Sequence, residues 1–224
     1  MFFEFKKRIE EKMKNIVGSL MILIFVSVGL SAETPKANFH LWAEGFATTQ
    51  GVILYPQYAW SVKISGGNIN GFGFVESTPH EQAFVNNLVS FTPPKASWFS
   101  VHTETGGFPF HDLGFFQVGP RINVTEAVPQ MKKPIAGLFV AALPRFIGIR
   151  PNNILVGGAT NSAKVKEVSI WGEGYRRFFP DGSGYGEYWL MAKPTSKSPV
   201  SFGILGHHVT GNSYIGVGLR LSFF

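Results

Sequence analysis

The sequence predicts an all-β fold, an antiparallel barrel of about twelve strands that follows an export signal. Three observations predict it. The 224 residues include 26 glycines and 22 phenylalanines, whereas only 15% of them are charged. Short runs of alternating apolar and polar residues recur along the chain, and Gly, Pro and Asn turns separate them. The last of these runs, Ser213–Phe223, is an amphipathic strand that ends the chain.

The first 32 residues have the order of a secretory signal peptide. An uncharged run from Ile16 to Leu30 follows a basic segment, and the small residues Ser31 and Ala32 come next. The basic residues before the run are Lys6, Lys7, Arg8, Lys12 and Lys14. Because the run is shorter than the ~20 residues of a membrane-spanning helix, a cleaved signal is expected and an uncleaved anchor is the alternative.

The signal sets the domain boundary. We expect cleavage after Ala32 or, as the second choice, after Ser31, with translation starting at Met1 or Met13. Residues 33–224 then form one barrel domain. Their longest apolar run, Ile135–Leu143, is too short for a membrane helix, so any membrane crossing has to be made by strands.

Twelve strands are expected in chain order, each bounded by turn residues. They are Asn38–Thr49, Val52–Ser65, Asn68–Glu76, Ala83–Phe91, Ser97–Glu104, Leu113–Val124, Ile135–Ile149, Ile154–Thr160, Lys164–Arg177, Ser183–Lys193, Val200–Thr210 and Ser213–Phe223. Thr105–Asp112 and Thr125–Pro134 are expected to be loops. The middle is less regular, since Pro120 interrupts one strand and Ile135–Ile149 also fits a helix, so ten or eight strands are the alternatives.

The terminal strand has one apolar side and one small or polar side. Ile215, Val217, Leu219, Leu221 and Phe223 share the apolar side, and Arg220 lies on the other. We expect this strand to close the ring by pairing with Asn38–Thr49, because an unpaired strand leaves its backbone groups without partners.

An exported chain of glycine- and aromatic-rich amphipathic strands that ends in such a strand resembles the bacterial outer-membrane β-barrel proteins. The resemblance is to the class as a whole and not to a single member. The alternating apolar residues of the last strand end at Phe223, and Phe224 lies one residue beyond this pattern. It implies an antiparallel transmembrane barrel in the outer membrane, with lipid around it and the barrel-assembly machinery recognising the terminal strand. A soluble periplasmic sandwich or lipocalin-like barrel is the alternative, but its solvent-facing side normally carries more charge.

Several function classes are disfavoured. The absence of cysteine excludes disulfides and thiol chemistry. The net charge of +6 comes from scattered basic residues that form no stripe, so no nucleic-acid partner is expected. The glycine-rich pieces lack the strand–loop–helix context of a phosphate loop, and we expect no cofactor.

Charged side chains on the inner faces of the predicted strands are the first candidate site residues, because they either cross-link a barrel wall or line a water path. The lumen-lining candidates are Glu44, Lys63, Arg145, Glu173, Arg177 and Arg220. Glu44 and Glu173 lie in two similar segments, Phe39–Phe46 and Val168–Tyr175, which share a Trp, small residue, Glu, Gly pattern.

Three further polar residues are weaker candidates. His102 and Glu104 lie two apart and share one strand face, which suits a polar network, but two ligands are too few to predict a metal. His208 is a possible base, although no serine follows it at a recognisable motif spacing and no acid follows to orient it. The sequence therefore favours a small passive, porin-like channel or a structural envelope protein. A barrel enzyme acting on envelope lipids and an adhesion or binding barrel are the alternatives.

Overall fold

The structure is a computed structural model, and it describes residues 36–77, 83–108 and 113–223. Within these residues, fourteen strands form one antiparallel sheet. They are β1 (Lys36–Thr48), β2 (Gly51–Ile64), β3 (Gly67–Glu76), β4 (Phe84–Thr92), β5 (Phe99–Phe108), β6 (Leu113–Asn123), β7 (Ile135–Leu143), β8 (Arg145–Gly148), β9 (Asn153–Thr160), β10 (Ala163–Val165), β11 (Val168–Phe178), β12 (Gly184–Lys193), β13 (Val200–Val209) and β14 (Asn212–Ser222).

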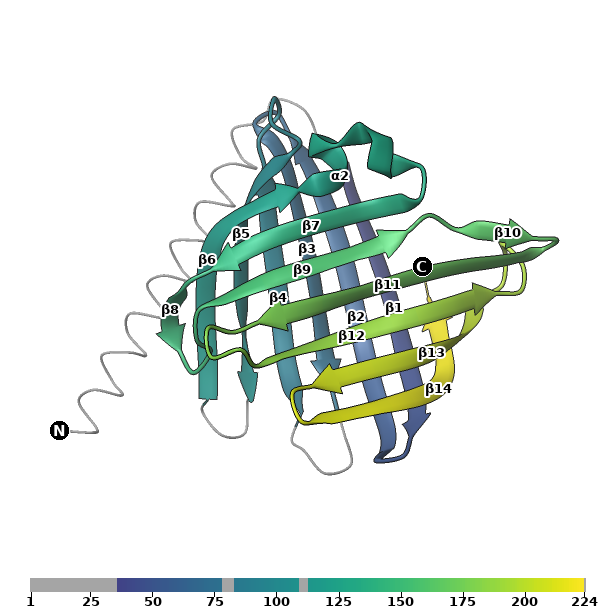
Figure 1. Cartoon of the computed structure of the whole chain (residues 1–224). Coiled ribbons are helices and arrows are strands. Elements are labelled where there is room, and N and C mark those ends of the chain that lie inside the picture. Colours follow the sequence, from purple (N-terminus) through teal and green to yellow (C-terminus); the bar gives the residue numbers. More distant parts are fainter. Residues whose placement is uncertain (1–35, 78–82, 109–112, 224) are drawn as a thin grey trace.

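The sheet closes on itself as a barrel of twelve strands, counted over the described residues, as the sequence predicted (Figure 1). β8 continues β7 beyond Pro144, since both pair with β6, and β10 pairs only with β11. The terminal strand β14 pairs with β1 from Ser222 opposite Trp42 to Gly216 opposite Thr48, so the predicted closure is confirmed. The pairing of β14 with β1 closes the ring, which removes the open sheet edge that these two strands would otherwise expose.

The structure differs from the predicted elements in four main places. The expected strand Ile135–Ile149 is divided at Pro144 into β7 and β8, because proline lacks the backbone N–H that a continuous strand needs. β5 runs to Phe108 rather than Glu104, because Thr105 to Phe108 go on pairing with β6. The expected strand Lys164–Arg177 is a short hairpin, in which Lys166 at φ +57° turns β10 back onto β11. The long loop after β6 contains α2 (Val124–Ala127) and the 3-10 turn η2 (Pro129–Lys132). The signal region, part of the predicted 105–112 loop and Phe224 lie outside the described residues.

The barrel has two distinct ends. The turn end carries the tight β1–β2, β11–β12 and β13–β14 connections, and Gly211 at φ +87° supplies the backbone geometry that the last of these turns needs. The helix end carries α2 and η2, together with the start of β1 and the end of β14 (Figure 1). The two ends matter below because the lumen is filled differently at each.

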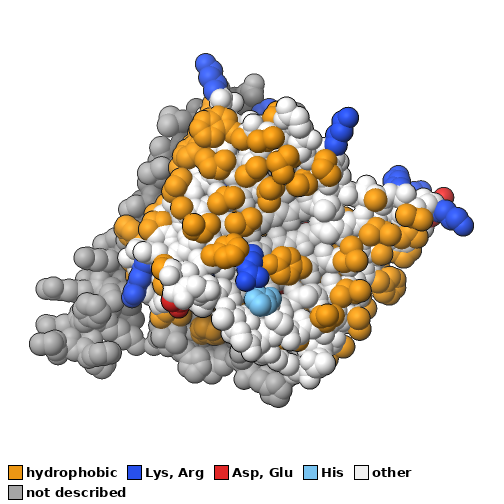
Figure 2. Space-filling model, in the orientation of Figure 1, with side chains coloured by type: hydrophobic (Ala, Val, Ile, Leu, Met, Phe, Trp, Pro, Cys, Tyr) orange, Lys and Arg blue, Asp and Glu red, His pale blue; other side chains and the backbone are white. Residues whose placement is uncertain are grey.

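Side chains alternate between the lumen and the outer surface of the wall. On β14 the apolar set points outward, with Ile215 69% and Val217 61% exposed, while Gly216 is buried. β2 behaves alike, with Val52 and Leu54 exposed and Ile53 buried between them. Hydrophobic side chains accordingly cover much of the face seen in Figure 2. The outer surface of the barrel is therefore largely apolar.

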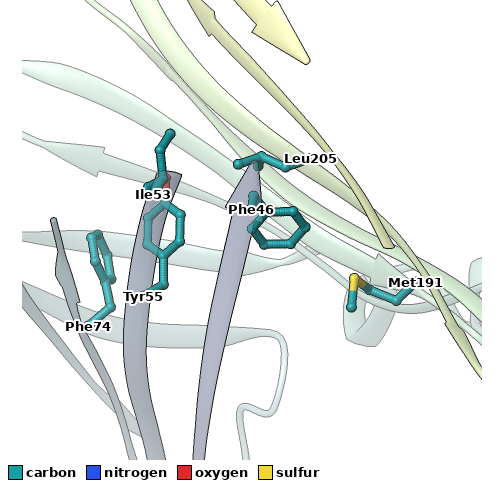
Figure 3. Packing of buried hydrophobic residues seen from close by; sticks show 6 residues of the cluster. All are labelled: Phe46, Ile53, Tyr55, Phe74, Met191 and Leu205. Carbon is teal, nitrogen blue, oxygen red and sulfur yellow. The ribbon is translucent and has the colours of Figure 1, made fainter. Parts of the chain in front are cut away.

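The lumen is packed in part by hydrophobic residues that meet across it. Phe46 and Tyr55 reach in from β1 and β2, and Met191 and Leu205 reach in from β12 and β13 (Figure 3). A smaller cluster is formed by Ala141 and Leu143 of β7 and Leu155 of β9. Within the described ranges, no helix is long and apolar enough to cross a membrane.

Candidate functional site

The lumen encloses a cavity of about 510 Å³ that reaches the helix end of the barrel. Thr125 and Glu126 of α2 line it at that end, and Asn86, Arg177 and Tyr185 line it toward the turn end. Its walls are mostly aromatic and aliphatic side chains. The large ones are Trp42, Tyr55, Phe72, Phe74, Leu88, Leu138, Phe139, Leu155, Tyr175 and Trp189. A cavity of this size and lining matches the pockets that hold small organic molecules.

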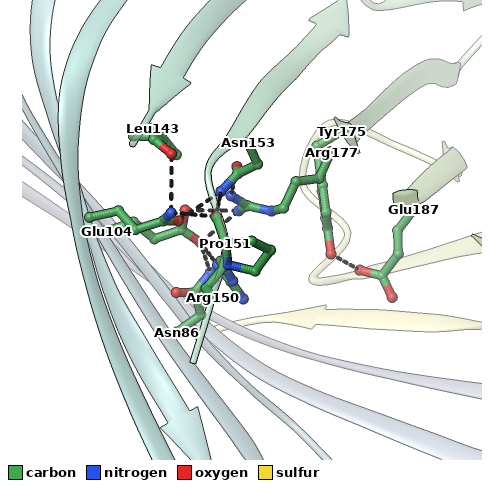
Figure 4. A network of polar contacts seen from close by, with 10 residues as sticks. Asn86, Glu104, Leu143, Arg150, Pro151, Asn153, Tyr175, Arg177 and Glu187 are labelled. Carbon is green, nitrogen blue, oxygen red and sulfur yellow. Dashed lines mark hydrogen bonds and ion pairs between the residues drawn. The ribbon is translucent and has the colours of Figure 1, made fainter. Parts of the chain in front are cut away.

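A buried ionic network forms the floor of the cavity (Figure 4). Glu104, on β5 and fully buried, accepts hydrogen bonds from Arg177 Nη2 at 2.7 and 2.8 Å and from Arg150 Nη1 at 2.5 Å. Asn86 Nδ2 donates a further bond of 2.7 Å to the same carboxylate. Two guanidinium groups and an amide therefore compensate one carboxylate that has no access to water, the arrangement that makes a buried charge tolerable.

The network continues to the wall at the turn end. Arg177 Nη1 donates to Asn153 Oδ1 at 2.6 Å, and Asn153 Nδ2 donates to Gln117 Oε1 at 2.9 Å. Gln117 Nε2 in turn donates to the carbonyl oxygens of Leu143 and Pro151. Beside it, the guanidinium of Arg150 lies 3.6 Å from the ring centre of Phe115. Side chains from β4, β5, β6, β9 and β11 thus cross-link opposite walls and fill the lumen at this level.

A second ionic cluster lies on the cavity wall near the β1–β14 seam. Arg220 Nε donates to Glu44 Oε1 at 2.5 Å, and Arg220 Nη2 also pairs with Glu173 on β11, three strands away in the sheet. The arginine carbon Cζ lies 5.7 Å from the ring centre of Trp42 and 5.9 Å from that of Trp171. The two segments that look alike in the sequence therefore bring their Trp-x-Glu pairs to one shared arginine.

A third buried carboxylate, Glu187 on β12, is held by two tyrosines. Tyr55 Oη donates to Glu187 Oε1 at 2.6 Å, and Tyr175 Oη donates to Oε2 at 2.9 Å. His207 Nε2 lies 4.0 Å from the same carboxylate. All three of Tyr55, Tyr175 and Glu187 line the cavity. This group supplies polar oxygen atoms in a wall that is otherwise mainly apolar.

Of the six residues expected in the lumen, four belong to these clusters. Glu44, Glu173 and Arg220 form the seam cluster, and Arg177 is the centre of the floor network. Lys63 and Arg145 are exposed near strand ends and join neither network.

The two candidate histidines, His102 and His208, lie on opposite sides of the barrel wall. His102 is buried, and its Nδ1 lies 2.7 Å from Ser90 Oγ, whereas its strand neighbour Glu104 bonds the two arginines. His208 lies on the outer wall, where its Nδ1 is 2.8 Å from Ser213 Oγ. The sequence did not indicate this serine, because the pair meets across the β13–β14 hairpin rather than along one strand.

Two residues that are central to these clusters, Arg150 and Glu187, were not predicted as site residues from the sequence. Arg150 lies between a predicted strand and the Pro151-Asn152-Asn153 turn, so its inward direction depends on the path of the connection. Glu187 lies in an ordinary alternating strand, and its tyrosine partners come from β2 and β11. The alternation of β12 placed Glu187 on the same face as Trp189, which was the one available indication.

No protein-family model matches this chain, and no curated protein sequence is similar to it. Over the described residues, no group of three or more His, Cys, Asp or Glu side chains is close enough to hold a metal ion.

Proposed function

We propose that this protein is an outer-membrane barrel that binds a small, mainly apolar molecule in its luminal cavity. The observation that carries the proposal is the cavity itself, aromatic-walled, about 510 Å³ in volume and ended by the Glu104 network. Pockets that bury small organic ligands have volumes of roughly 300–1,000 Å³ and mainly apolar linings with a few polar groups. The Glu187 and Arg220 clusters are such polar groups.

The membrane location is supported by the distribution of side chains. Ionisable side chains such as Glu44, Glu104 and Arg177 are buried in the lumen, whereas Val, Ile, Leu and Phe side chains are exposed on the outside. Monomeric water-soluble proteins rarely expose a continuous apolar surface of this kind, but a membrane barrel requires one. The export signal expected in residues 1–32 supports the same location. Recognition of β14 by the barrel-assembly machinery stays a prediction.

A passive channel for small solutes is the second candidate. It is favoured by the charged residues Arg121, Glu173 and Arg220 on the cavity wall, since water-filled lumens that select solutes carry such groups. The cross-lumen contacts of Glu104 with Arg150 and Arg177 oppose it, because they fill the lumen between the cavity and the turn end.

Ligand binding can be tested through the tryptophans. In protein reconstituted in lipid nanodiscs, with Trp60 and Trp98 replaced by phenylalanine, the remaining emission comes from Trp42, Trp171 and Trp189. We expect the neutral nitroaromatic 4-nitrobenzyl alcohol to quench this emission saturably. Ala159→Phe, which adds a ring inside the cavity, should make the quenching linear in concentration. Thr160→Phe, the next residue on the exposed side of β9, is the matched control and should leave it saturable.

Planar-bilayer recordings separate the two candidates. We expect no single-channel steps from the purified barrel. Steady steps would favour the channel, and linear quenching of the wild type together with silent bilayers would leave only a structural role in the envelope.

A further inference from the structure

One row of residues on the outer wall differs from its apolar surroundings. Backbone pairing places Arg176 on β11 opposite Gly186 on β12, Gly186 opposite His208 on β13, and His208 opposite Ser213 on β14. Residues paired in this way point to the same side of a sheet. Figure 2 shows a basic side chain and a histidine side by side on this face, with hydrophobic side chains around them.

Basic side chains are rare on this part of the outer wall. Of the described outward positions on β11 to β14, Arg176 is the only charged one and His208 the only histidine. The acids of these strands, Glu173 and Glu187, line the lumen instead. Asp181, in the adjoining turn, already accepts hydrogen bonds from the backbone nitrogen and the hydroxyl of Ser183. Among the described residues, no carboxylate forms an ion pair with Arg176.

Glycine at position 186 puts no side chain between the two basic residues. Strands lie about 4.8 Å apart, so the Cα atoms of Arg176 and His208 are separated by roughly 10 Å across Gly186. A Cβ on Gly186 would lie 2.5 Å from the Tyr175 carbonyl oxygen and 3.2 Å from Arg176 Cβ, so the close approach of β11 and β12 requires glycine here. The arginine and the imidazole therefore lie on the two sides of a bare stretch of backbone, over which both can reach one acceptor group.

Both flanking side chains can donate hydrogen bonds. The guanidinium of Arg176 has only donors, and its Cζ lies 5.2 Å from the ring centre of Phe178. His208 Nδ1 is 2.8 Å from Ser213 Oγ, and when this hydroxyl donates to Nδ1 the proton of the neutral imidazole is on Nε2. Ser213 thus acts as a positioning residue, and the site offers donors to a ligand that has only acceptors.

The surroundings indicate what carries that acceptor group. The row lies within two residues of the turn end of β11, and exposed apolar side chains flank it, among them Phe178, Tyr188 and Ile215. A free anion would gain nothing from contact with these apolar side chains, whereas an acyl chain lying along the wall would cover them. We propose that the row Arg176–Gly186–His208–Ser213 binds the phosphate of a lipid headgroup at the membrane surface, with the acyl chain on the wall below it. This inference rests on the proposed membrane location.

The site can be tested by lipid titration in a phosphate-free detergent, octyl tetraethylene glycol, with native mass spectrometry of the folded full chain. We expect saturable binding of one dioleoyl phosphatidylglycerol per barrel and no comparable binding of dioleoyl glycerol, which has the same chains without phosphate. Arg176→Ala and His208→Ala should each weaken binding, the former by about tenfold, as expected for a lost charged hydrogen bond. Arg176→Lys should recover part of the affinity, and Ser213→Ala should cost less than His208→Ala.

Arg145→Ala, at an exposed arginine outside the row, is the control and should bind as the wild type does. Equal retention of phosphatidylglycerol by wild type, Arg176→Ala and His208→Ala would overturn the proposal. Binding of inorganic phosphate with the same sensitivity to the variants, and no preference for the lipid, would show that the ligand is a free anion and would also overturn it. Because the titration is done in detergent, a barrel that folds but does not insert into vesicles contradicts the membrane location without affecting this test.

Discussion

At the scale of single residues, the protein depends on charges that water does not reach. Glu44, Glu104, Glu187 and Arg177 are each at most 2% exposed. Taking an ion out of water costs several kcal/mol unless partners compensate it, and the ionic partners of these groups come from other strands or from the β8–β9 loop. The positions of Arg150, Arg177 and Arg220 are therefore fixed by the closed ring, since each bonds a carboxylate on another strand.

Removing one ionic partner of a buried carboxylate should destabilise the folded barrel. We expect Arg177→Ala to lower the free energy of unfolding by roughly 3 kcal/mol, because Glu104 then keeps only Arg150 as its ionic partner in a buried site. Urea unfolding of the barrel folded in the phosphate-free detergent, followed by tryptophan emission, measures the change. Adding Glu104→Gln to Arg177→Ala should recover part of the loss, because it removes the uncompensated charge.

Arg176→Ala is the matched control for that experiment. Arg176 is the preceding residue and points to the outer side of the same strand, so its removal should change the free energy of unfolding by about 0.5 kcal/mol or less. Equal losses from Arg176→Ala and Arg177→Ala would contradict the assignment of the two faces of β11.

At the scale of elements, the seam between β1 and β14 decides whether the sheet becomes a ring. The two strands approach closely where Phe46 pairs with Gly218, and a Cβ on Gly218 would lie 1.9 Å from the Gly45 carbonyl oxygen. The lack of a side chain on Gly218 lets the two backbones approach at this place. The same strand supplies Arg220, so the seam and the seam cluster are built together.

Gly218→Ala should therefore weaken closure. We expect a loss of roughly 1–3 kcal/mol, typical of overpacking at a tight contact. The measurement is the temperature at which the compact band of the folded barrel disappears in unheated-versus-heated gel electrophoresis. Gly206→Ala on β13, where the nearest atom to a new Cβ is 3.9 Å away, should have little effect. A similar loss in both variants would mean that lost backbone freedom, and not the seam contact, is responsible.

At the scale of the whole molecule, the barrel has ionised groups inside and apolar side chains outside. This is the reverse of a water-soluble β-barrel, whose interior is apolar and whose outer surface is polar. The Glu104 network ends the cavity toward the turn end, whereas the cavity reaches the helix end. This arrangement favours ligand binding over the passage of solutes through the barrel.

A charge in the middle of the outer wall tests the membrane location. Val217→Arg places it near the centre of β14, and we expect a loss of about 2–4 kcal/mol for unfolding from a lipid bilayer. Phe223→Arg, beyond the end of the same strand, should cost only about 0–1 kcal/mol because it lies near the membrane surface. If Val217→Arg costs no more than Phe223→Arg, the outer wall is in contact with water.

The alternation along single strands was enough to predict the barrel, its twelve strands, the closure by β14 and the outward direction of Ile215 and Val217. That pattern is local, since a strand turns successive side chains to opposite faces whatever its neighbours are. The tertiary structure alone decided which inward groups meet: Glu104 with Arg150 and Arg177, Glu187 with Tyr55, Glu173 with Arg220, and outside the barrel His208 with Ser213. These contacts depend on strand register, on ring closure and on the path of the turns, none of which the periodicity of one strand contains.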